Sequence, residues 1–292
     1  MGTHPGRSGR ASAVTPSERV LEHGRVSVVD VGSGPPLLLI HGLGGTWRNW
    51  EANIPGLARH HRVIALDLPG FGGSEPYAGE VSVARYVATL VELLDQLDVL
   101  EATIVGNSMG GLLAMETALV RPDRVTATVL VSSGGLPLTS WRHQRVLIPQ
   151  ARLVNRLLRR PVCRWALRRS QLARVLLGGQ VFFDARSVPP ELLSAALDGL
   201  GAHGFAAALD AGSDYDARVR APGIRKPTLV VWGRQDPLLP VEMGHELHEL
   251  IRGSHFEVWD RTGHCAMLEH PARFDVRVTS FIEELGSQRP AS

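Results

Sequence analysis

Short apolar runs alternate with amphipathic stretches along most of the chain. The apolar runs, rich in β-branched residues, cover residues 25–31, 36–42, 62–67, 102–107, 125–133, 227–233 and 255–260. Helical spacing of apolar positions occurs between them, at 47–58, 82–97, 109–120, 240–251 and 271–285. This alternation is typical of βαβ units, so it predicts an α/β protein with a mostly parallel sheet flanked by helices. Because the runs are almost continuously apolar, we expect strands that are buried on both faces.

One long interval interrupts this alternation. Residues 136–222 contain no strand-like run but several helical segments, such as QARLVNRLLRR and PPELLSAALDGL. A structureless connection of that length would be unusual in a compact domain, so a helical insertion between two strands is expected. The predicted organisation is a core made of residues 20–135 and 223–286, an insertion at 136–222, a flexible tail at 1–19 and a carboxyl-terminal tail at 287–292.

Composition narrows the class of protein. The chain is 44% hydrophobic and 21% charged, and no apolar run approaches the roughly 18 residues that span a bilayer. These values predict a globular protein without a membrane span. The first residues lack the apolar core of a secretory signal, and two cysteines, Cys163 and Cys265, make no disulfide framework. A cytoplasmic location is therefore expected.

Charge is balanced overall but unevenly distributed. The net charge of +2 does not indicate a nucleic-acid partner. Residues 141–183, however, contain no acidic residue and ten arginines: Arg142, Arg145, Arg152, Arg156, Arg159, Arg160, Arg164, Arg168, Arg169 and Arg174. In QARLVNRLLRR the arginines share one helical face and the leucines gather on another. The segment is either a solvated basic face or a contact for anionic substrates or an anionic membrane surface.

The stretch IVGNSMGG places a serine in a glycine-rich turn between a strand-like run and a helical pattern. Gly106 precedes Ser108 by two residues and Gly110 follows it by two. Glycines at these positions let a strained turn close and expose the serine hydroxyl at the carboxyl edge of the sheet, where open α/β sheets bind ligands. Ser108 is therefore the predicted nucleophile.

A serine nucleophile needs a general base. Among twelve histidines, His264 directly follows the last strand-like run, so its ring can reach the same sheet edge as Ser108. For four others, which lie in helical patterns or in the HGLGG turn, a structural or solvated role is expected: His41, His245, His248 and His270.

The third member should be a carboxylate that orients the imidazole. Asp236 follows the run at 227–233 and gives the chain order serine, acid, histidine that a G-x-S-x-G elbow requires. The acids of the insertion and its exit lack a preceding strand and are expected to be solvated: Asp210, Asp214 and Asp216.

The glycine-rich turn HGLGG follows the run at 36–42 and can supply backbone N–H groups. We predict that the amides of Leu43 and Met109 form the oxyanion hole that acyl transfer needs. No H-E-x-x-H, paired cysteines or phosphate-binding G-K-[ST] occurs. No metal or cofactor is therefore predicted.

Five stretches together resemble the α/β-hydrolase superfamily over residues 20–286: HGLGG, DLPGFGGS, GNSMGG, GRQDPLLP and GHCAMLEHP. The resemblance implies the α/β-hydrolase fold, with 136–222 as an inserted helical cap that roofs the pocket and sets substrate choice. Because the nucleophile position holds Ser108 and not an aspartate, the resemblance points away from the haloalkane dehalogenases and epoxide hydrolases.

Within the superfamily, GNSMGG and WRNWEANI are similar to segments of the meta-cleavage-product hydrolases, which cut carbon–carbon bonds in 2-hydroxy-6-oxo-dienoates. This resemblance implies that Asn49 and Asn107 are pocket residues, and Gly42 is predicted beside them. Two positions depart from the family. Cys265 stands where the family has a tryptophan, and Ala196 stands where its cap arginine holds the substrate carboxylate, although Arg186 could substitute.

Three functions follow as hypotheses. The leading one is a cofactor-independent serine hydrolase of a small or medium carboxylic ester. The alternative is carbon–carbon bond hydrolysis of the meta-cleavage-product type with the same residues. The substrate would be an ester in the first case and a ketone in the second. The third is a non-catalytic ligand-binding protein of the same fold.

Overall fold

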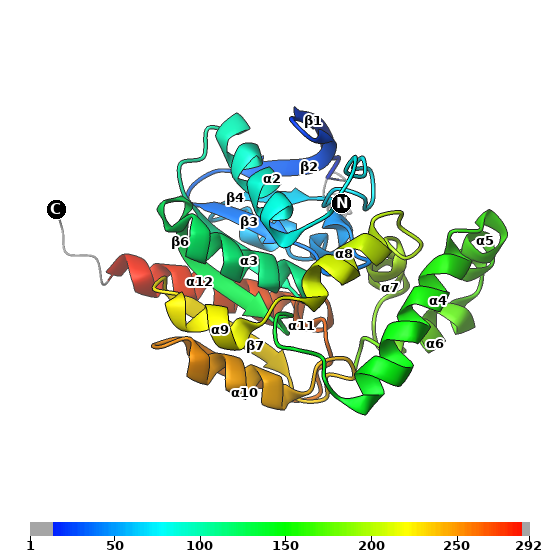
Figure 1. The fold of residues 1–292 in the computed structure, drawn as a ribbon. Coiled ribbons are helices and arrows are strands. Elements are labelled where there is room, and N and C mark those ends of the chain that lie inside the picture. Colours follow the sequence, from blue (N-terminus) through cyan, green and yellow to red (C-terminus); the bar gives the residue numbers. More distant parts are fainter. Residues whose placement is uncertain (1–13, 288–292) are drawn as a thin grey trace, which may run out of the picture.

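The computed structural model describes residues 14–287, and its centre is an eight-stranded sheet (Figure 1). The strand order is β1-β2-β4-β3-β5-β6-β7-β8. β1 and β2 run antiparallel to their neighbours, and the other pairs are parallel. The strands are β1 (Ser17–Leu21), β2 (Gly24–Gly32), β3 (Pro36–Ile40), β4 (Arg62–Leu66), β5 (Ala102–Asn107), β6 (Val125–Val131), β7 (Thr228–Gly233) and β8 (His255–Trp259).

Two hydrophobic clusters lie on opposite faces of the sheet because the central strands are apolar on both sides. One face is covered by α2 (Val83–Gln96), α3 (Met109–Val120) and α10 (Val241–Leu250). The other is covered by η1 (Trp47–Trp50), α1 (Ile54–Leu57), α11 (Ala266–Glu269) and α12 (Pro271–Ser287). The predicted fold class is confirmed. The helix predicted at 47–58 is wrong in detail, since it divides into η1 and α1, with Pro55 in the first turn of α1.

The parallel register brings the carboxyl ends of the central strands to one edge. Ile40 of β3 pairs with Gly106 of β5, Asn107 pairs with Val131 of β6, and Val131 pairs with Val231 of β7. The loops that follow these strands therefore meet at this edge, which is where a ligand site is expected in an open α/β sheet.

The interval between β6 and β7 is helical. It contains η3 (His143–Leu147), α4 (Ile148–Leu158), α5 (Pro161–Arg169), α6 (Gln171–Gly178), α7 (Pro190–Leu197), α8 (Phe205–Ser213), α9 (Ala217–Arg220) and η4 (Ala221–Gly223). In Figure 1, α4–α6 extend away from the sheet, whereas α9 lies beside α10. The N–H of Ala217 donates to the carbonyl of Gly135 at 2.8 Å, so the two ends of the insertion are joined there.

The ends of the chain differ from the predicted tails. β1 begins at Ser17 and pairs with β2, so a flexible tail over 1–19 is wrong for residues 17–19. The strand was missed because it lies at the sheet edge and buries only Leu21, which leaves no apolar periodicity to detect. Ser287 ends α12, while residues 1–13 and 288–292 of the predicted tails lie outside the described residues. None of the helices within 14–287 is both long and apolar enough to cross a membrane.

Candidate active site

Ser108 occupies a strained turn between β5 and α3. Its backbone has φ 55° and ψ −117°, a conformation that side-chain-bearing residues rarely adopt. A Cβ on Gly106 would overlap the carbonyl of Gly110, and a Cβ on Gly110 would overlap the carbonyl of Ile40. Both glycines are therefore required for α3 to start so close to β3 and β5. The N–H of Ser108 donates to Val131 O at 3.0 Å, which ties the turn to β6.

Asp236 and His264 follow β7 and β8 and are bonded to each other. His264 Nδ1 lies 2.8 Å from Asp236 Oδ2, and both residues are buried. The other oxygen, Oδ1, accepts the N–H groups of Leu238 at 2.8 Å and Leu239 at 2.9 Å. A carboxylate that accepts three hydrogen bonds is fixed in orientation. It directs the proton of His264 to Nδ1 and leaves Nε2 as an acceptor.

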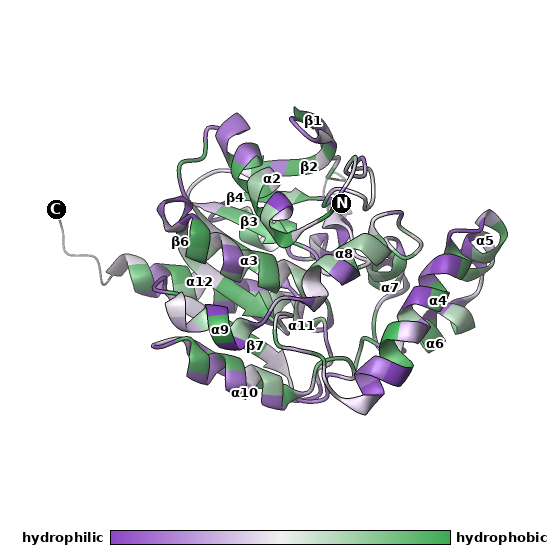
Figure 2. Ribbon diagram, in the orientation of Figure 1, coloured by the Kyte–Doolittle hydropathy of each residue, from purple (hydrophilic) through white to green (hydrophobic). Residues whose placement is uncertain are grey.

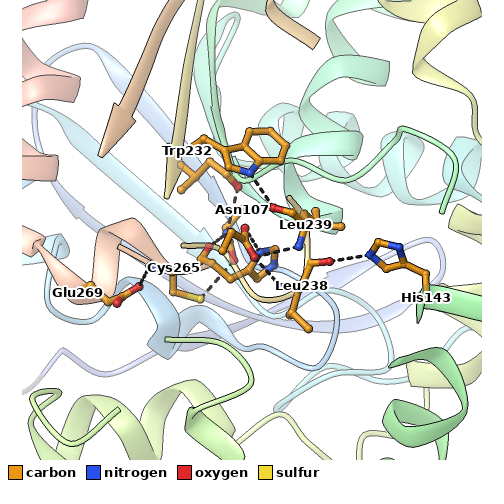
Figure 3. Close-up of polar contacts among 11 residues, drawn as sticks. Asn107, His143, Trp232, Leu238, Leu239, Cys265 and Glu269 are labelled. Carbon is orange, nitrogen blue, oxygen red and sulfur yellow. Dashed lines mark hydrogen bonds and ion pairs between the residues drawn. The ribbon is translucent and has the colours of Figure 1, made fainter. Parts of the chain in front are cut away.

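The loop that holds Asp236 is anchored from two sides (Figure 3). Trp232 Nε1 donates to the carbonyl of Leu239 at 2.9 Å, and His143 Nε2 lies 2.7 Å from the carbonyl of Leu238. Trp232 belongs to β7 and His143 to the inserted helices. The position of Asp236 therefore depends on both the sheet and the insertion.

Asn107 holds the loop of His264 through its side-chain amide. Its Nδ2 donates to Val131 O at 3.1 Å and to His264 O at 3.0 Å. The thiol of Cys265 lies 3.9 Å from Asn107 Oδ1, and burial raises the pKa of this thiol (Figure 3). Asn107 reaches the cavity wall, but its amide protons are used to position backbone.

The HGLGG turn is held by His41. Its Nε2 accepts the N–H of Leu68 at 2.9 Å, so Nδ1 carries the proton and donates to Gly42 O at 2.7 Å. Burial lowers the pKa of His41, which keeps the ring neutral. The structural role expected for His41 agrees with these contacts.

The N–H groups of Leu43 and Met109 are both positioned near the nucleophile. Leu43 lines the cavity beside Ser108, and Met109 is the first residue of α3. Neither N–H donates to another protein atom within residues 14–287. The oxyanion hole predicted from these two amides stays a prediction.

Ser108 and His264 line one cavity of about 250 Å³ between the sheet edge and the inserted helices. Gly42, Asn49 and Asn107, the predicted pocket residues, also line it. Asn49 uses Oδ1 to accept the N–H of Thr46 at 2.7 Å. Most of the wall is apolar and includes Leu138, Leu147, Ile148, Val154, Leu197 and Phe205.

The cavity wall also includes Ala196, which stands where the resemblance implies a cap arginine. Arg186 is exposed, and its N–H donates to Asp184 Oδ1 at 3.0 Å. It does not line the cavity, so the substitution considered for it is not supported by its position. Within the described residues, no arginine or lysine lines this cavity.

The histidines and acids for which the sequence predicts structural or solvated roles do not line this cavity. His245 packs edge-on against Phe256 and His248 stacks on the same ring. His270 Nε2 lies 3.0 Å from Thr262 Oγ1. Asp210 pairs with Arg152, and Asp216 caps α9.

Glu269 is a residue that sequence reasoning missed. Its Oε1 accepts the N–H of Gly263 at 2.8 Å, and its Oε2 accepts the N–H of Phe183 at 2.9 Å. Burial raises the pKa of Glu269 to about 7, although these hydrogen bonds oppose that shift. The N–H of His264 donates to Val181 O at 2.7 Å. The loop of His264 is thus joined to the insertion twice, once through Glu269.

Two sequence signals could have drawn attention to Glu269. It lies five residues after His264 within GHCAMLEHP, and it is an acid in an otherwise apolar stretch. A buried acid normally has a partner. The partner itself, the N–H of Phe183, lies 86 residues away and could not be named from spacing.

Comparison with known proteins identifies the class. The family model described as alpha/beta hydrolase fold matches residues 35–271, so the chain belongs to the α/β-hydrolase family and is a hydrolase. This confirms the predicted family.

Particular relatives are similar over most of their length. The chain is 32% identical to the 2-hydroxymuconate semialdehyde hydrolase of Pseudomonas sp. (strain CF600), over 89% of this chain and 91% of that protein. It is 33% identical to the 2-hydroxy-6-oxo-2,4-heptadienoate hydrolase of Pseudomonas putida, over 87% of this chain and 91% of that protein. Among solved structures, the meta-cleavage product hydrolase CumD from Pseudomonas fluorescens IP01 superposes with a TM-score of 0.70 at 27% identity, over 89% and 94% of the two chains.

Proposed function

We propose that this hydrolase works by a Ser-His-Asp acyl-enzyme mechanism. Ser108 Oγ attacks the substrate carbonyl while His264 Nε2 accepts its proton, and Asp236 stabilises the imidazolium that forms. The N–H groups of Leu43 and Met109 donate hydrogen bonds to the oxyanion of the tetrahedral intermediate and stabilise its charge. The proton then passes from His264 to the leaving group. A water molecule repeats the sequence on the acyl-Ser108 ester and releases the acid.

The observation that carries this proposal is the bonded pair of Asp236 and His264 beside the cavity that Ser108 lines. The strained elbow adds support, because it exposes the hydroxyl at the start of α3. The prediction that the enzyme needs no metal or cofactor agrees with this mechanism, which uses only protein groups, and it remains a prediction.

The chemistry of the cavity wall favours an uncharged acyl group. Apolar side chains dominate the wall, and its polar members besides Ser108 and His264 include the side-chain amides of Asn49, Asn107 and Gln180. A carboxylate that enters such a pocket loses its water shell at a cost of several kcal/mol unless a strong partner replaces it. We therefore propose a small or medium carboxylic ester as the preferred substrate class.

The second candidate is carbon–carbon bond hydrolysis, which the named relatives favour. The first-formed intermediate and the acyl-enzyme would be held by the same residues, but the leaving group would be a carbanion equivalent that needs protonation. A dienoate substrate carries a carboxylate, and the wall position where the resemblance implies an arginine is Ala196 in this chain. The two candidates therefore differ in whether the pocket must bind a negatively charged group of the substrate.

A direct comparison of kcat/KM tests both candidates. For short to medium p-nitrophenyl esters we expect a value at least about tenfold above that for a 2-hydroxy-6-oxo-dienoate, a difference of about 1.4 kcal/mol in transition-state binding. Ser108→Ala is the control, and it should abolish turnover of both. A dienoate preferred by the same ratio would make carbon–carbon hydrolysis the function. If Ser108→Ala retained more than a few per cent of the activity, the mechanism itself would be wrong.

A further inference from the structure

The inserted helices α4, α5 and α6 carry large apolar side chains on their outer surface. Within the described residues, most of the exposed large hydrophobic side chains lie between Trp141 and Phe183. They are Trp141, Val146, Leu153, Leu157, Val162, Trp165, Leu172, Leu176 and Phe183. Several are well exposed, with Trp141 at 73%, Leu172 at 69% and Trp165 at 58%. Apolar exposure concentrated in this way marks an interaction surface.

The arrangement on α4 differs from the expectation drawn from its sequence. The sequence predicts that the leucines of QARLVNRLLRR gather on one face. Instead Val154 lines the cavity and Leu158 is buried, whereas Leu153 and Leu157 point outward. α4 therefore has two apolar sides, one toward the substrate cavity and one toward solvent.

The same outward pairing repeats along the three helices. Leu153 and Leu157 are four residues apart on α4, and Leu172 and Leu176 are four apart on α6. Val162 and Trp165 are three apart on α5. Residues at these spacings lie on one helical face. The three helices are consecutive and in contact, and they extend from the rest of the molecule in Figure 1.

Positive charge surrounds these apolar pairs. The segment 141–183 carries ten arginines and no acid, although the net charge of the whole chain is only +2. Among the described residues, Arg152 is the one arginine of this set that pairs with a carboxylate, that of Asp210. Arg156 and Arg159 are exposed on α4 beside the outward leucines. Figure 2 shows hydrophobic and hydrophilic residues side by side along α4, α5 and α6.

We propose that the basic-apolar face of the segment 141–183, which includes α4–α6, docks on an anionic lipid bilayer. Helices that lie in a membrane interface combine arginines with leucine and tryptophan in this way, because the cations meet lipid phosphates and the apolar side chains enter the acyl boundary. The charge argues against a second copy of the chain, since a symmetric contact through this face would bring arginines against arginines. The proposal does not depend on the substrate or on the catalytic mechanism.

Docking would place the substrate cavity next to the lipid. α4 contributes Ile148, Ala151 and Val154 to the cavity wall, and α6 contributes Leu177. The helices that meet the bilayer with one side therefore close the cavity with the other.

Co-sedimentation of the purified full chain with lipid vesicles tests the proposal. We expect binding to vesicles of phosphatidylcholine mixed with phosphatidylglycerol and little binding to phosphatidylcholine alone. Binding should weaken between ~0.1 M and ~1 M salt, over which the Debye length falls from about 10 to about 3 Å. Equal sedimentation with both vesicle types, or none with either, would overturn the proposal.

Matched variants locate the surface. Arg156→Gln/Arg159→Gln should weaken the partition coefficient roughly 30-fold, since each basic residue at an anionic surface contributes about fivefold. Arg59→Gln/Arg252→Gln removes two exposed arginines outside the face, and it should bind like the unaltered chain. If the two double variants lose binding equally, the attraction is not located on α4 and the proposal fails.

The apolar contribution is tested separately. Leu153→Ser/Leu157→Ser should weaken vesicle binding at least about tenfold, because it removes two apolar side chains whose transfer from water into the bilayer favours binding. Val219→Ser/Val276→Ser, at exposed positions elsewhere, is the control. Thermal unfolding shows whether each variant is folded. Sedimentation equilibrium detects the rival occupant: a dimer that the leucine variant dissociates, without vesicle binding by the unaltered chain, would assign the face to a second copy and overturn the proposal.

Discussion

Asp236→Asn is the substitution that tests the proposed proton transfer most directly. The carboxylate of Asp236 receives three donors: the N–H groups of Leu238 and Leu239 on Oδ1, and His264 Nδ1 on Oδ2. An asparagine has one oxygen and one NH₂ group. The two backbone donors retain the oxygen, because the opposite orientation would place the NH₂ group against both of them. The NH₂ group must then face His264.

This exchange reverses the proton arrangement on the imidazole. His264 Nδ1 has to accept a hydrogen bond from the new NH₂ group, so the ring proton moves to Nε2. A protonated Nε2 cannot take the proton of Ser108. The expected loss in kcat is about 10⁴-fold, which corresponds to about 5 kcal/mol in transition-state free energy. The fold should persist, since both backbone hydrogen bonds remain and the contact with His264 is kept with its direction reversed.

Two measurements check this expectation. Initial rates on a p-nitrophenyl ester give kcat, and the ¹⁵N chemical shifts of His264 report which ring nitrogen carries the proton. Asp260→Asn is a matched control, because Asp260 is an exposed acid near the same loop that pairs with Arg234 at the surface. Exposed ion pairs contribute about 0–1 kcal/mol, so the control should keep its activity within a few-fold.

The proposed role of Asp236 is wrong if Asp236→Asn keeps more than about a tenth of the activity, because a ring with its proton on Nε2 could not support that rate. It also fails if activity is lost while Nδ1 still carries the proton. That result would show that the loss comes from displaced backbone and not from the tautomer.

Three further predictions address the Glu269 contact, the elbow and the cavity wall. Burial raises the pKa of Glu269 from 4.5 to about 7, so the folded state binds the extra proton and the stability from this group falls as pH rises from about 4.5 to 7. The free energy of unfolding of the unaltered chain minus that of Glu269→Gln should therefore fall by about 1–2 kcal/mol between pH 5 and 8 in denaturant titrations, and a rise would contradict the assignment. Gly106→Ala should lower stability by more than about 3 kcal/mol because its Cβ overlaps the carbonyl of Gly110, whereas Gly286→Ala in open space should be neutral or stabilising; similar melting temperatures for the two would refute the steric argument. Ala196→Arg should raise the ratio of dienoate to ester kcat/KM about tenfold or more by pairing the carboxylate, and an unchanged ratio would show that this wall position does not meet it.

The sequence by itself determined seven of the eight strands, all but β1, and the elbow. Strand-forming runs and helical periods are local patterns, and the strained turn at Ser108 needs only the glycines two residues to either side of it. The loops that carry Asp236 and His264 could be placed at the same edge because parallel strands end together. The structure brings these two side chains to 2.8 Å, and their catalytic roles remain predictions.

Tertiary structure alone decided what holds these loops. His143 supports the Asp236 loop from 95 residues away, and Glu269 joins the His264 loop to Phe183 from 86 residues away. Such contacts depend on how the inserted helices fold back over the sheet. Short-range patterns in the sequence do not predict that arrangement.

The outer surface of the insertion was decided in the same way. Periodicity placed Leu153 and Leu157 on an apolar face of α4, but burial depends on which neighbours cover that face. Val154 lines the cavity and Leu158 is buried, whereas Leu153 and Leu157 remain exposed to solvent. Amphipathic spacing predicts which residues share one face of a helix. Only the packed structure shows which elements lie against that face.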